Sequence, residues 1–269
     1  MDNRPIGVFD SGLGGLSVIK ELNRVLPNEN IIYFGDTGRV PYGTRSADTI
    51  VRYARQDERF LLSHDVKLII AACGTVSSVA AFTAKELPVP FIEVVTPAAT
   101  AAVNATKNNK IGVLGTAATV NSNSYKNKML ELNSNITVVQ NACPLFVQLV
   151  ETGWIDRNDE VTVATAKRYL QPLVDAGVDT VILGCTHFPA IKDIIADIMG
   201  NGVTLINSGE QAALSAADYL KEHNLEGQGN KRRYFVSDRA ESFASTAAIL
   251  LGSSIEDDVE MINIDSFGG

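Results

Sequence analysis

Short apolar runs recur along this chain, and a longer segment of helical period separates each run from the next. The runs are apolar on consecutive positions, which is typical of strands that are covered on both faces. Such strands, alternating with helices, predict an α/β protein whose mainly parallel sheets carry helices on both sides. We expect strands at residues 6–9, 31–34, 68–71, 91–94, 111–114, 137–139, 180–183, 204–206 and 233–236, and helices at 16–26, 47–63, 76–85, 161–175, 190–198 and 211–222.

Two stretches from the first half of the chain are echoed in the second half. Residues 6–12 (IGVFDSG) resemble residues 111–117 (IGVLGTA), and residues 65–75 resemble residues 177–187. In each half, a first strand ends in small polar residues and a later strand ends in a cysteine. This repeat predicts two pseudo-symmetric, doubly wound α/β domains with an active site at the interface between them.

The composition narrows the classes of function. The chain has 269 residues, which suits two small domains, and its formal net charge is -8, whereas a nucleic-acid binder presents a basic surface. No apolar run is long enough to span a bilayer, and the first residues do not resemble a secretory leader. The three cysteines and three histidines are scattered without the spacing of a zinc site, which favours free thiols in a reducing compartment. We therefore expect a cytoplasmic protein that binds no nucleic acid, no membrane and no metal.

Cys73 and Cys185 each follow an apolar strand and precede the expected start of a helix. Ligands bind at the carboxyl ends of parallel strands, and the N-terminus of a helix favours the thiolate form of a nearby cysteine. A lone cysteine is more often a small buried apolar residue, but two at equivalent strand ends indicate a shared function. Two thiols that face one α-carbon from opposite sides suit the inversion of a stereocentre, whereas a cysteine hydrolase uses only one. Cys143 has no equivalent partner, and we expect it to pack in the interior or to line a wall.

Polar residues near the expected strand ends are further candidates. Asp10 and Ser11 end the first strand before the glycine-rich segment 12–15, which matches neither a P-loop nor a dinucleotide-binding fingerprint. The structural alternative for Asp10 is the N-cap of the following helix. His187 lies two residues after the second cysteine and can exchange a proton with a nearby thiol. Tyr42 lies in a loop rich in turn residues, and such loops often carry function.

Together these residues resemble the glutamate racemase family over nearly the whole chain. The matching motifs are each weak but jointly specific, and they lie at residues 7–15, 33–37, 40–43, 72–73, 143–146, 151 and 183–189. Residues 207–210 and 234–243 resemble the last strands of the family. The resemblance implies a racemase that interconverts L- and D-glutamate without pyridoxal phosphate or any other cofactor. It would supply D-glutamate for peptidoglycan synthesis.

The resemblance also implies a domain organisation. The first α/β domain would comprise residues 1–96 and 209–269, and the second would comprise residues 97–208. Each domain would carry one of the two catalytic cysteines and face the other across the active site. The implied partner is a small-molecule substrate, glutamate, and a homodimer is left open.

The roles of individual residues are carried over from the family. Cys73 would act at the α-proton of D-glutamate with the support of Asp10. Cys185 would act at the α-proton of L-glutamate with the support of His187 and Glu151. The substrate would be held by side-chain and backbone groups of Asp10, Ser11, Tyr42, Gly43, Gly74, Thr75, Thr186 and His187.

One departure from the family pattern lies beside the first cysteine. The family usually has asparagine where this chain has Gly74, and smaller departures lie at Gly38, Thr44 and Asn207. An asparagine would contact the substrate, so one hypothesis is an enzyme weaker on glutamate, which Gly74→Asn would improve about tenfold or more. The other is a tolerated change that Thr75 and Ser77 offset.

Three alternatives stay open from the sequence alone. A racemase of aspartate or of another amino acid fits the same motifs. A two-domain small-molecule binding protein without catalysis would explain the duplicated layout, but not two thiols with a histidine beside one of them. The third alternative is a regulatory relative that retains only the fold.

Overall fold

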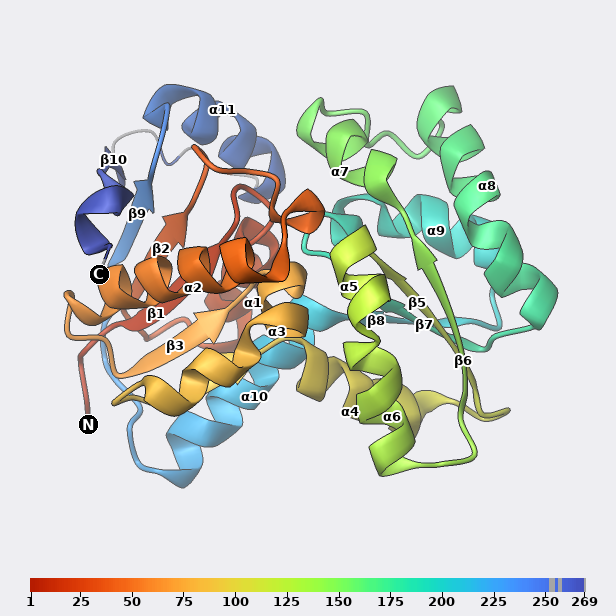
Figure 1. Ribbon diagram of the computed structural model, residues 1–269, viewed down its shortest axis with the longest axis horizontal. Coiled ribbons are helices and arrows are strands. Elements are labelled where there is room, and N and C mark those ends of the chain that lie inside the picture. The colour runs from red at the N-terminus through yellow and green to blue at the C-terminus, as the bar shows by residue number, and fades with distance from the viewer. Residues whose placement is uncertain (252–254, 256–257, 269) are drawn as a thin grey trace.

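The computed structural model describes residues 1–251, 255 and 258–268, and it consists of two lobes that are each built on one sheet (Figure 1). The strand order is β10-β9-β2-β1-β3-β4 in the first sheet and β6-β5-β7-β8 in the second. Every strand pair within the described residues is parallel, which confirms the expected α/β class. The strands are β1 (Ile6–Asp10), β2 (Ile31–Gly35), β3 (Leu68–Ala71), β4 (Phe91–Glu93), β5 (Lys110–Gly115), β6 (Thr137–Ala142), β7 (Thr180–Leu183), β8 (Thr204–Asn207), β9 (Arg232–Val236) and β10 (Val259–Met261).

Helices cover both faces of each sheet. One hydrophobic cluster of the first lobe lies under α1 and α10, and another lies under α2 and α3. In the second lobe, one cluster includes α7, α8 and α9, and the other includes α4 and α6. The helices are α1 (Leu16–Val25), α2 (Ala47–Leu62), α3 (Gly74–Val79), α4 (Val95–Ala105), α5 (Ala117–Ser122), α6 (Ser124–Leu132), α7 (Pro144–Glu151), α8 (Glu160–Ala176), α9 (Lys192–Met199), α10 (Ser208–Glu222) and α11 (Ala240–Leu251).

The strand order itself is repeated between the lobes. The order β2-β1-β3-β4 in the first sheet corresponds to β6-β5-β7-β8 in the second. β1 and β5 begin the two echoed stretches, and β3 and β7 lead into the two cysteines. The internal similarity in the sequence therefore corresponds to a structural repeat, which β9 and β10 extend in the first sheet.

The chain enters the second lobe at α4 and returns to the first lobe at α10. The alanines of α10 pack in the first-lobe core beside α1. β9 then pairs with β2 over its whole length, from Arg232 opposite Ile31 to Val236 opposite Gly35. The domain limits after residues 96 and 208 stay predictions, and residues 252–254, 256–257 and 269 of the predicted first domain lie outside the described part of the chain.

Three expected segments differ from the structure. The helix expected at residues 76–85 is broken at Ala80, where α3 gives way to a 3-10 helix. The backbone N–H of Thr83 donates to the carbonyl of Ala80 at 3.0 Å, and a bond between residues three apart is typical of a 3-10 helix. Residues 207–210 and 234–243, which resemble the last strands of the family, are only partly strand. β8 ends at Asn207 and α10 begins at the next residue, and β9 ends at Val236 with α11 beginning four residues later.

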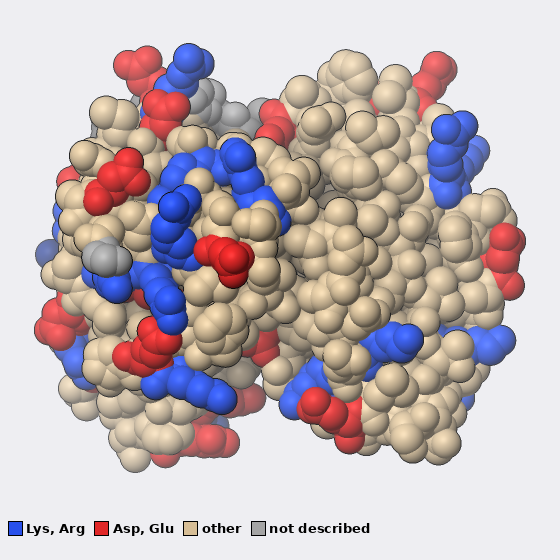
Figure 2. All heavy atoms as spheres, viewed as in Figure 1, with Lys and Arg blue, Asp and Glu red and all other residues tan. Residues whose placement is uncertain are grey.

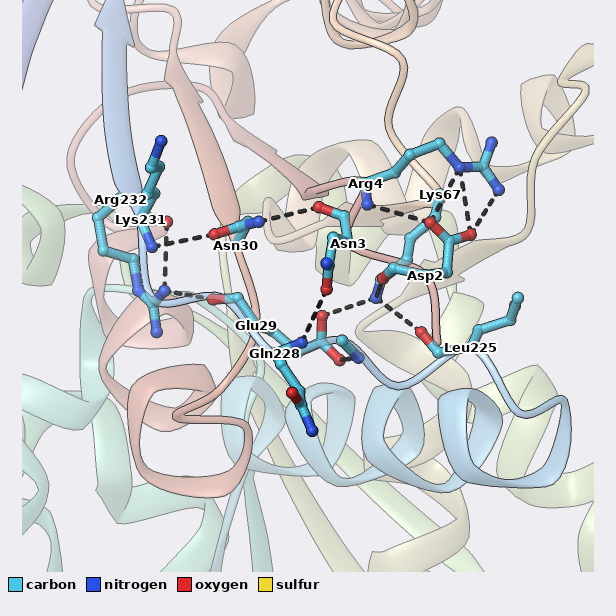
Figure 3. Close-up of polar contacts among 11 residues, drawn as sticks. Asp2, Asn3, Arg4, Glu29, Asn30, Lys67, Leu225, Gln228, Lys231 and Arg232 are labelled. Carbon is cyan, nitrogen blue, oxygen red and sulfur yellow. Dashed lines mark hydrogen bonds and ion pairs between the residues drawn. The ribbon is translucent and has the colours of Figure 1, made fainter.

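A buried cluster around Lys67 lies at the amino end of β3, away from the cysteine end (Figure 3). The ammonium of Lys67 lies 2.6 Å from Oε2 of Glu29 and donates to the carbonyls of Asp2 and Leu225 at 2.6 and 2.7 Å. The side chains of Lys67 and Glu29 are 0% and 4% exposed. This cluster fastens the N-terminal residues and the segment after α10 to the first sheet.

No helix within the described residues is long and apolar enough to cross a membrane.

Candidate active site

A cavity of about 160 Å³ lies where the carboxyl ends of strands from the two sheets meet. Ser11 and residues 40–44 and 73–75 from the first lobe line it, together with residues 116–117 and 184–187 from the second. Loops that follow parallel strands gather at the same edge of a sheet, so each lobe contributes its functional edge. Most of the residues predicted from the sequence to hold substrate therefore meet at one place.

Cys73 follows β3 and precedes α3, as predicted, and it lines the cavity. Its Sγ lies 3.6 Å from the hydroxyl of Ser11, and only 4% of the residue is exposed. Burial, reinforced by the negative charge of Asp10, raises the pKa of the Cys73 thiol to about 12. At neutral pH Cys73 therefore keeps its proton and can act as an acid.

Cys185 comes from the second lobe and has a different environment. Its Sγ lies 3.7 Å from Nδ1 of His187, and Nε2 of that imidazole lies 2.9 Å from Oε1 of Glu151. Burial by itself would lower the pKa of His187, but the hydrogen bonds to Cys185 and Glu151 outweigh it and raise this pKa to about 10. The imidazole is therefore protonated at neutral pH and places a positive charge beside the Cys185 sulfur.

Asp10 lies behind the cavity wall rather than in it. One carboxylate oxygen accepts the backbone N–H of Gly12 at 3.0 Å, and the other lies 3.5 Å from the hydroxyl of Thr186 in the second lobe. Burial raises the pKa of the Asp10 carboxyl, and the positive charge of His187 opposes this effect. The N-cap position of α1 is occupied by Gly15 and not by Asp10. The carboxylate is thus placed between the two lobes, close to both candidate acid–base groups.

Tyr42 and Gly43 line the cavity, but the hydroxyl of Tyr42 is engaged elsewhere. It contacts the buried carboxylates of Asp36 and Asp57, the second at 3.1 Å. Arg39 forms ion pairs with the same two carboxylates. Burial, together with the Asp36 carboxylate, raises the pKa of Asp57 well above its usual value. Tyr42 therefore offers its backbone and ring to the cavity, while its hydroxyl fixes the loop.

Threonine hydroxyls supply polar groups from both lobes. Oγ1 of Thr75 lies 3.0 Å from Oγ1 of Thr116, and Thr186 also lines the cavity. Thr116 was not predicted, although the repeat carries the signal. It occupies the place in residues 111–117 that Ser11 occupies in residues 6–12.

Gly74 lines the cavity, but the surroundings leave no room for a side chain. A Cβ added here would lie less than 3.0 Å from the carbonyl oxygen of Gly184. The hydroxyl of Ser77 does not replace the missing amide, because it donates to the carbonyl of Ala71 and accepts the N–H of Val94. The geometry therefore opposes the expectation that Gly74→Asn improves the enzyme.

The three other positions that the sequence resemblance marked as departures, at Asn207, Gly38 and Thr44, have the following surroundings. Asn207 caps α10 by accepting the N–H of Gly209 at 3.0 Å. The N–H of Gly38 donates to the hydroxyl of Ser237, and Thr44 lines the cavity.

The surface of the molecule and its possible metal ligands bear on its binding partners. On the face drawn in Figure 2, several basic side chains lie close together over the first lobe with acidic side chains around them, and charged side chains are sparse on the second lobe. Within the described residues, no group of three or more His, Cys, Asp or Glu side chains could hold a metal ion.

Residues 6–216 match the family model described as Asp/Glu/Hydantoin racemase, and the chain belongs to this family. The glutamate racemase of Geobacter metallireducens is 42% identical over 259 residues, which cover 94% of this chain and 95% of that relative. The crystal structure of glutamate racemase from Francisella tularensis in complex with D-glutamate is 40% identical. It has a TM-score of 0.92 and covers 99% of this chain and 100% of that chain.

A more distant relative shares the architecture. The aspartate racemase of Picrophilus torridus is 20% identical, with a TM-score of 0.55, and covers 82% of this chain and 94% of that chain. At this level of identity the likeness shows the fold alone.

Proposed function

We propose that this chain is a glutamate racemase that works by acid–base chemistry at two cysteines. The observation that carries the proposal is that Cys73 and Cys185, at equivalent strand ends of two repeated lobes, line one cavity. Relatives named glutamate racemase match almost the full length at 42% and 40% identity, which supports glutamate over aspartate as the substrate. The product, D-glutamate, would supply peptidoglycan synthesis.

In the direction from L- to D-glutamate, Cys185 is the base. Its thiolate takes the α-proton, so that the Cα–H bond breaks, an S–H bond forms and an electron pair stays on the α-carbon. The thiol of Cys73 then gives its proton to the opposite face of the α-carbon and becomes the thiolate. The reverse direction exchanges the two roles, and the atoms and charges balance in both directions.

In the free enzyme, the proton on Cys73 and the positive charge on His187 suit the start of the reaction from L- to D-glutamate. Cys73 holds its proton, because its pKa is raised to about 12, and it is therefore ready as the acid. His187 holds a positive charge beside Cys185, because its pKa is raised to about 10. Glu151 keeps this charge in place by pairing with the other side of the imidazole.

The remaining residues would hold the substrate. The hydroxyls of Ser11, Thr75 and Thr186 and the backbone of Tyr42 and Gly43 offer hydrogen bonds around the cavity. Asp10 would complement the substrate ammonium from behind the wall. No step in this sequence requires pyridoxal phosphate or a metal ion, because the two thiols carry the proton in both directions.

The same proposal includes the cellular compartment, the domain limits and the oligomeric state. The three cysteines are free and buried, which supports a reducing compartment such as the cytoplasm. We assign residues 1–96 with 209–269 to one domain and residues 97–208 to the other. Sedimentation velocity of the purified protein tests whether it forms a homodimer.

Incubation with L-glutamate in heavy water tests the function. We expect loss of optical activity and incorporation of one solvent deuterium at the α-carbon. Racemisation of L-aspartate alone would identify the aspartate alternative, and binding of glutamate without turnover would identify a binding protein. Activity should survive a chelator and hydroxylamine, which traps pyridoxal phosphate, and its loss with either reagent would contradict the cofactor-independent mechanism.

A further inference from the structure

The two cysteine-bearing turns meet through a backbone contact between Gly74 and Gly184. A Cβ at Gly74 would lie less than 3.0 Å from the carbonyl oxygen of Gly184, a distance that real Cβ atoms essentially never show. Gly74 follows Cys73, and Gly184 precedes Cys185. The contact therefore joins the two lobes directly beside the two sulfur atoms.

Gly184 cannot move back to make room. Its N–H donates to the carbonyl of Leu114 at 2.8 Å. A Cβ on Gly184 would itself lie 2.7 Å from that carbonyl oxygen and 3.0 Å from the ring of Tyr125. Tyr125 is fully buried in the second-lobe core. The turn at Gly184 is thus enclosed between its own core and Gly74.

The turn at Gly74 is fixed in the same way. The N–H of Ala72 donates to the carbonyl of Phe9 in the neighbouring strand at 2.9 Å, and the carbonyl of Cys73 accepts the N–H of Ser77 at 2.9 Å. Because both turns are tied to their own sheets, a side chain at position 74 has to push the lobes apart as units.

Two further glycines of the first lobe face the second lobe around the same cavity. A Cβ at Gly14 would overlap the side chains of Thr186 and His187, and one at Gly43 would lie 2.9 Å from Cβ of Thr116. At Gly14, Gly43 and Gly74 the backbone of the first lobe therefore lies against the second lobe. Of these glycines, Gly74 is the one that directly follows a cysteine.

We propose that Gly74 sets how closely the two lobes close, and with it the separation of the Cys73 and Cys185 sulfur atoms. Its effect on turnover rests on the proposed racemase function, whereas its effect on closure does not. A misplacement of about 1 Å between reacting groups can lower a rate by roughly 100-fold. Gly74 is therefore a positioning residue, and a side chain there lowers kcat instead of adding a useful substrate contact.

The test compares the wild-type chain with Gly74→Ala and Gly74→Asn. The matched control is Gly202→Ala, because a Cβ at this exposed glycine meets no described atom within 4 Å. Alkylation by iodoacetamide is followed for each cysteine by mass spectrometry, without substrate. Cys73 and Cys185 should react several-fold faster in Gly74→Ala than in the wild type. Cys143, which is fully buried inside the second lobe, reports in the same experiment whether the fold is intact.

Racemisation of both glutamate enantiomers is measured on the same proteins. We expect kcat to fall by roughly 10- to 100-fold in Gly74→Ala and further in Gly74→Asn, with a smaller change in KM. Wild-type alkylation rates in Gly74→Ala, or a higher kcat/KM in Gly74→Asn, would overturn the proposal. Rapid alkylation of Cys143 in Gly74→Ala would also overturn it, because the contact would then serve folding and not spacing. If the wild type does not racemise glutamate, the proposed function fails, and the alkylation rates still decide the role of Gly74 in closure.

Discussion

His187 and Glu151 form an ion pair that links the turn after β7 to the last residue of α7, with Nε2 and Oε1 2.9 Å apart. The imidazole is buried, whereas the glutamate side chain is 31% exposed. The ion pair therefore connects the side of the cavity that carries Cys185 to the protein surface, and Cys185 lies at the buried end of the pair.

This pair predicts a pH dependence for the L-to-D reaction. The active form is the one with His187 protonated, and its pKa is raised to about 10, so kcat should fall as the pH rises through about 10. Glu151→Gln removes an interaction that raises this pKa and should move the falling limb to lower pH. The measurement is kcat against pH for both proteins. A limb at the same pH in both would show that Glu151 does not act through His187.

Replacement of either cysteine by serine should remove most racemisation. A serine hydroxyl ionises far less readily than a thiol, so Cys73→Ser and Cys185→Ser each lose an acid–base group, at a cost of roughly 10²- to 10⁴-fold in kcat. Initial rates in both directions measure this loss. Cys143→Ser is the control, because Cys143 packs against the second-lobe core and donates to the carbonyl of Asn141. Near wild-type turnover in either of the first two variants would refute the two-base assignment.

Tyr42→Phe should loosen the loop that forms one cavity wall. The variant removes the hydroxyl that Asp36 and Asp57 share, and an unsatisfied buried polar group costs about 1–3 kcal/mol. The hydrogen bond from Tyr42 lowers the pKa of Asp57, so its loss should raise that pKa further. We expect a lower free energy of unfolding in urea and a higher KM for glutamate. Tyr219→Phe on α10 is the control, and equal KM values in the two variants would contradict a role for the network in shaping the site.

Lys67→Met should destabilise the protein without changing its chemistry. Removing the cation leaves the carboxylate of Glu29 buried and unpaired, which costs about 3–5 kcal/mol in comparable cases. Lys128→Met breaks an exposed pair with Glu131 and should cost at most about 1 kcal/mol. Urea denaturation measures both free energies. A similarly small loss of unfolding free energy in the two variants would mean that the Lys67 cluster does not stabilise the fold. We expect kcat at 25 °C to stay unchanged in both variants.

The sequence allowed the strands and the cysteines to be placed because their signals are local. Runs such as Leu68–Ala71 and Thr180–Leu183 are apolar on consecutive positions, and both have the predicted bounds. α4 was missed because its alanine-rich sequence has no clear polar face, although four of its residues are buried. β10 was missed because it is a short edge strand whose residues are mostly exposed.

The parts of the site that the sequence could not predict depend on contacts between distant segments. Tyr42 was predicted to hold the substrate, but the fold brings Asp57 from α2 to its hydroxyl. At Gly74 the sequence left two hypotheses open, a lost substrate contact and a tolerated change, because only the approach of Gly184 from the other lobe shows that a side chain would meet backbone there. Periodicity and motif spacing carry no information about how closely two lobes approach.

The pairing of β9 with β2 has a consequence for synthesis of the chain. β2 (IIYFG) leaves the ribosome long before β9, because the whole second lobe is translated between them. During that interval one edge of β2 lacks its partner, and an apolar edge strand is a template for aggregation. Chains truncated before Arg232 should therefore scatter light at concentrations where a solution of the 269-residue chain stays clear. Equal clarity of the two solutions would show that another segment covers the edge of β2. By pairing with β2, the late-synthesised β9 therefore protects the newly made chain from aggregation.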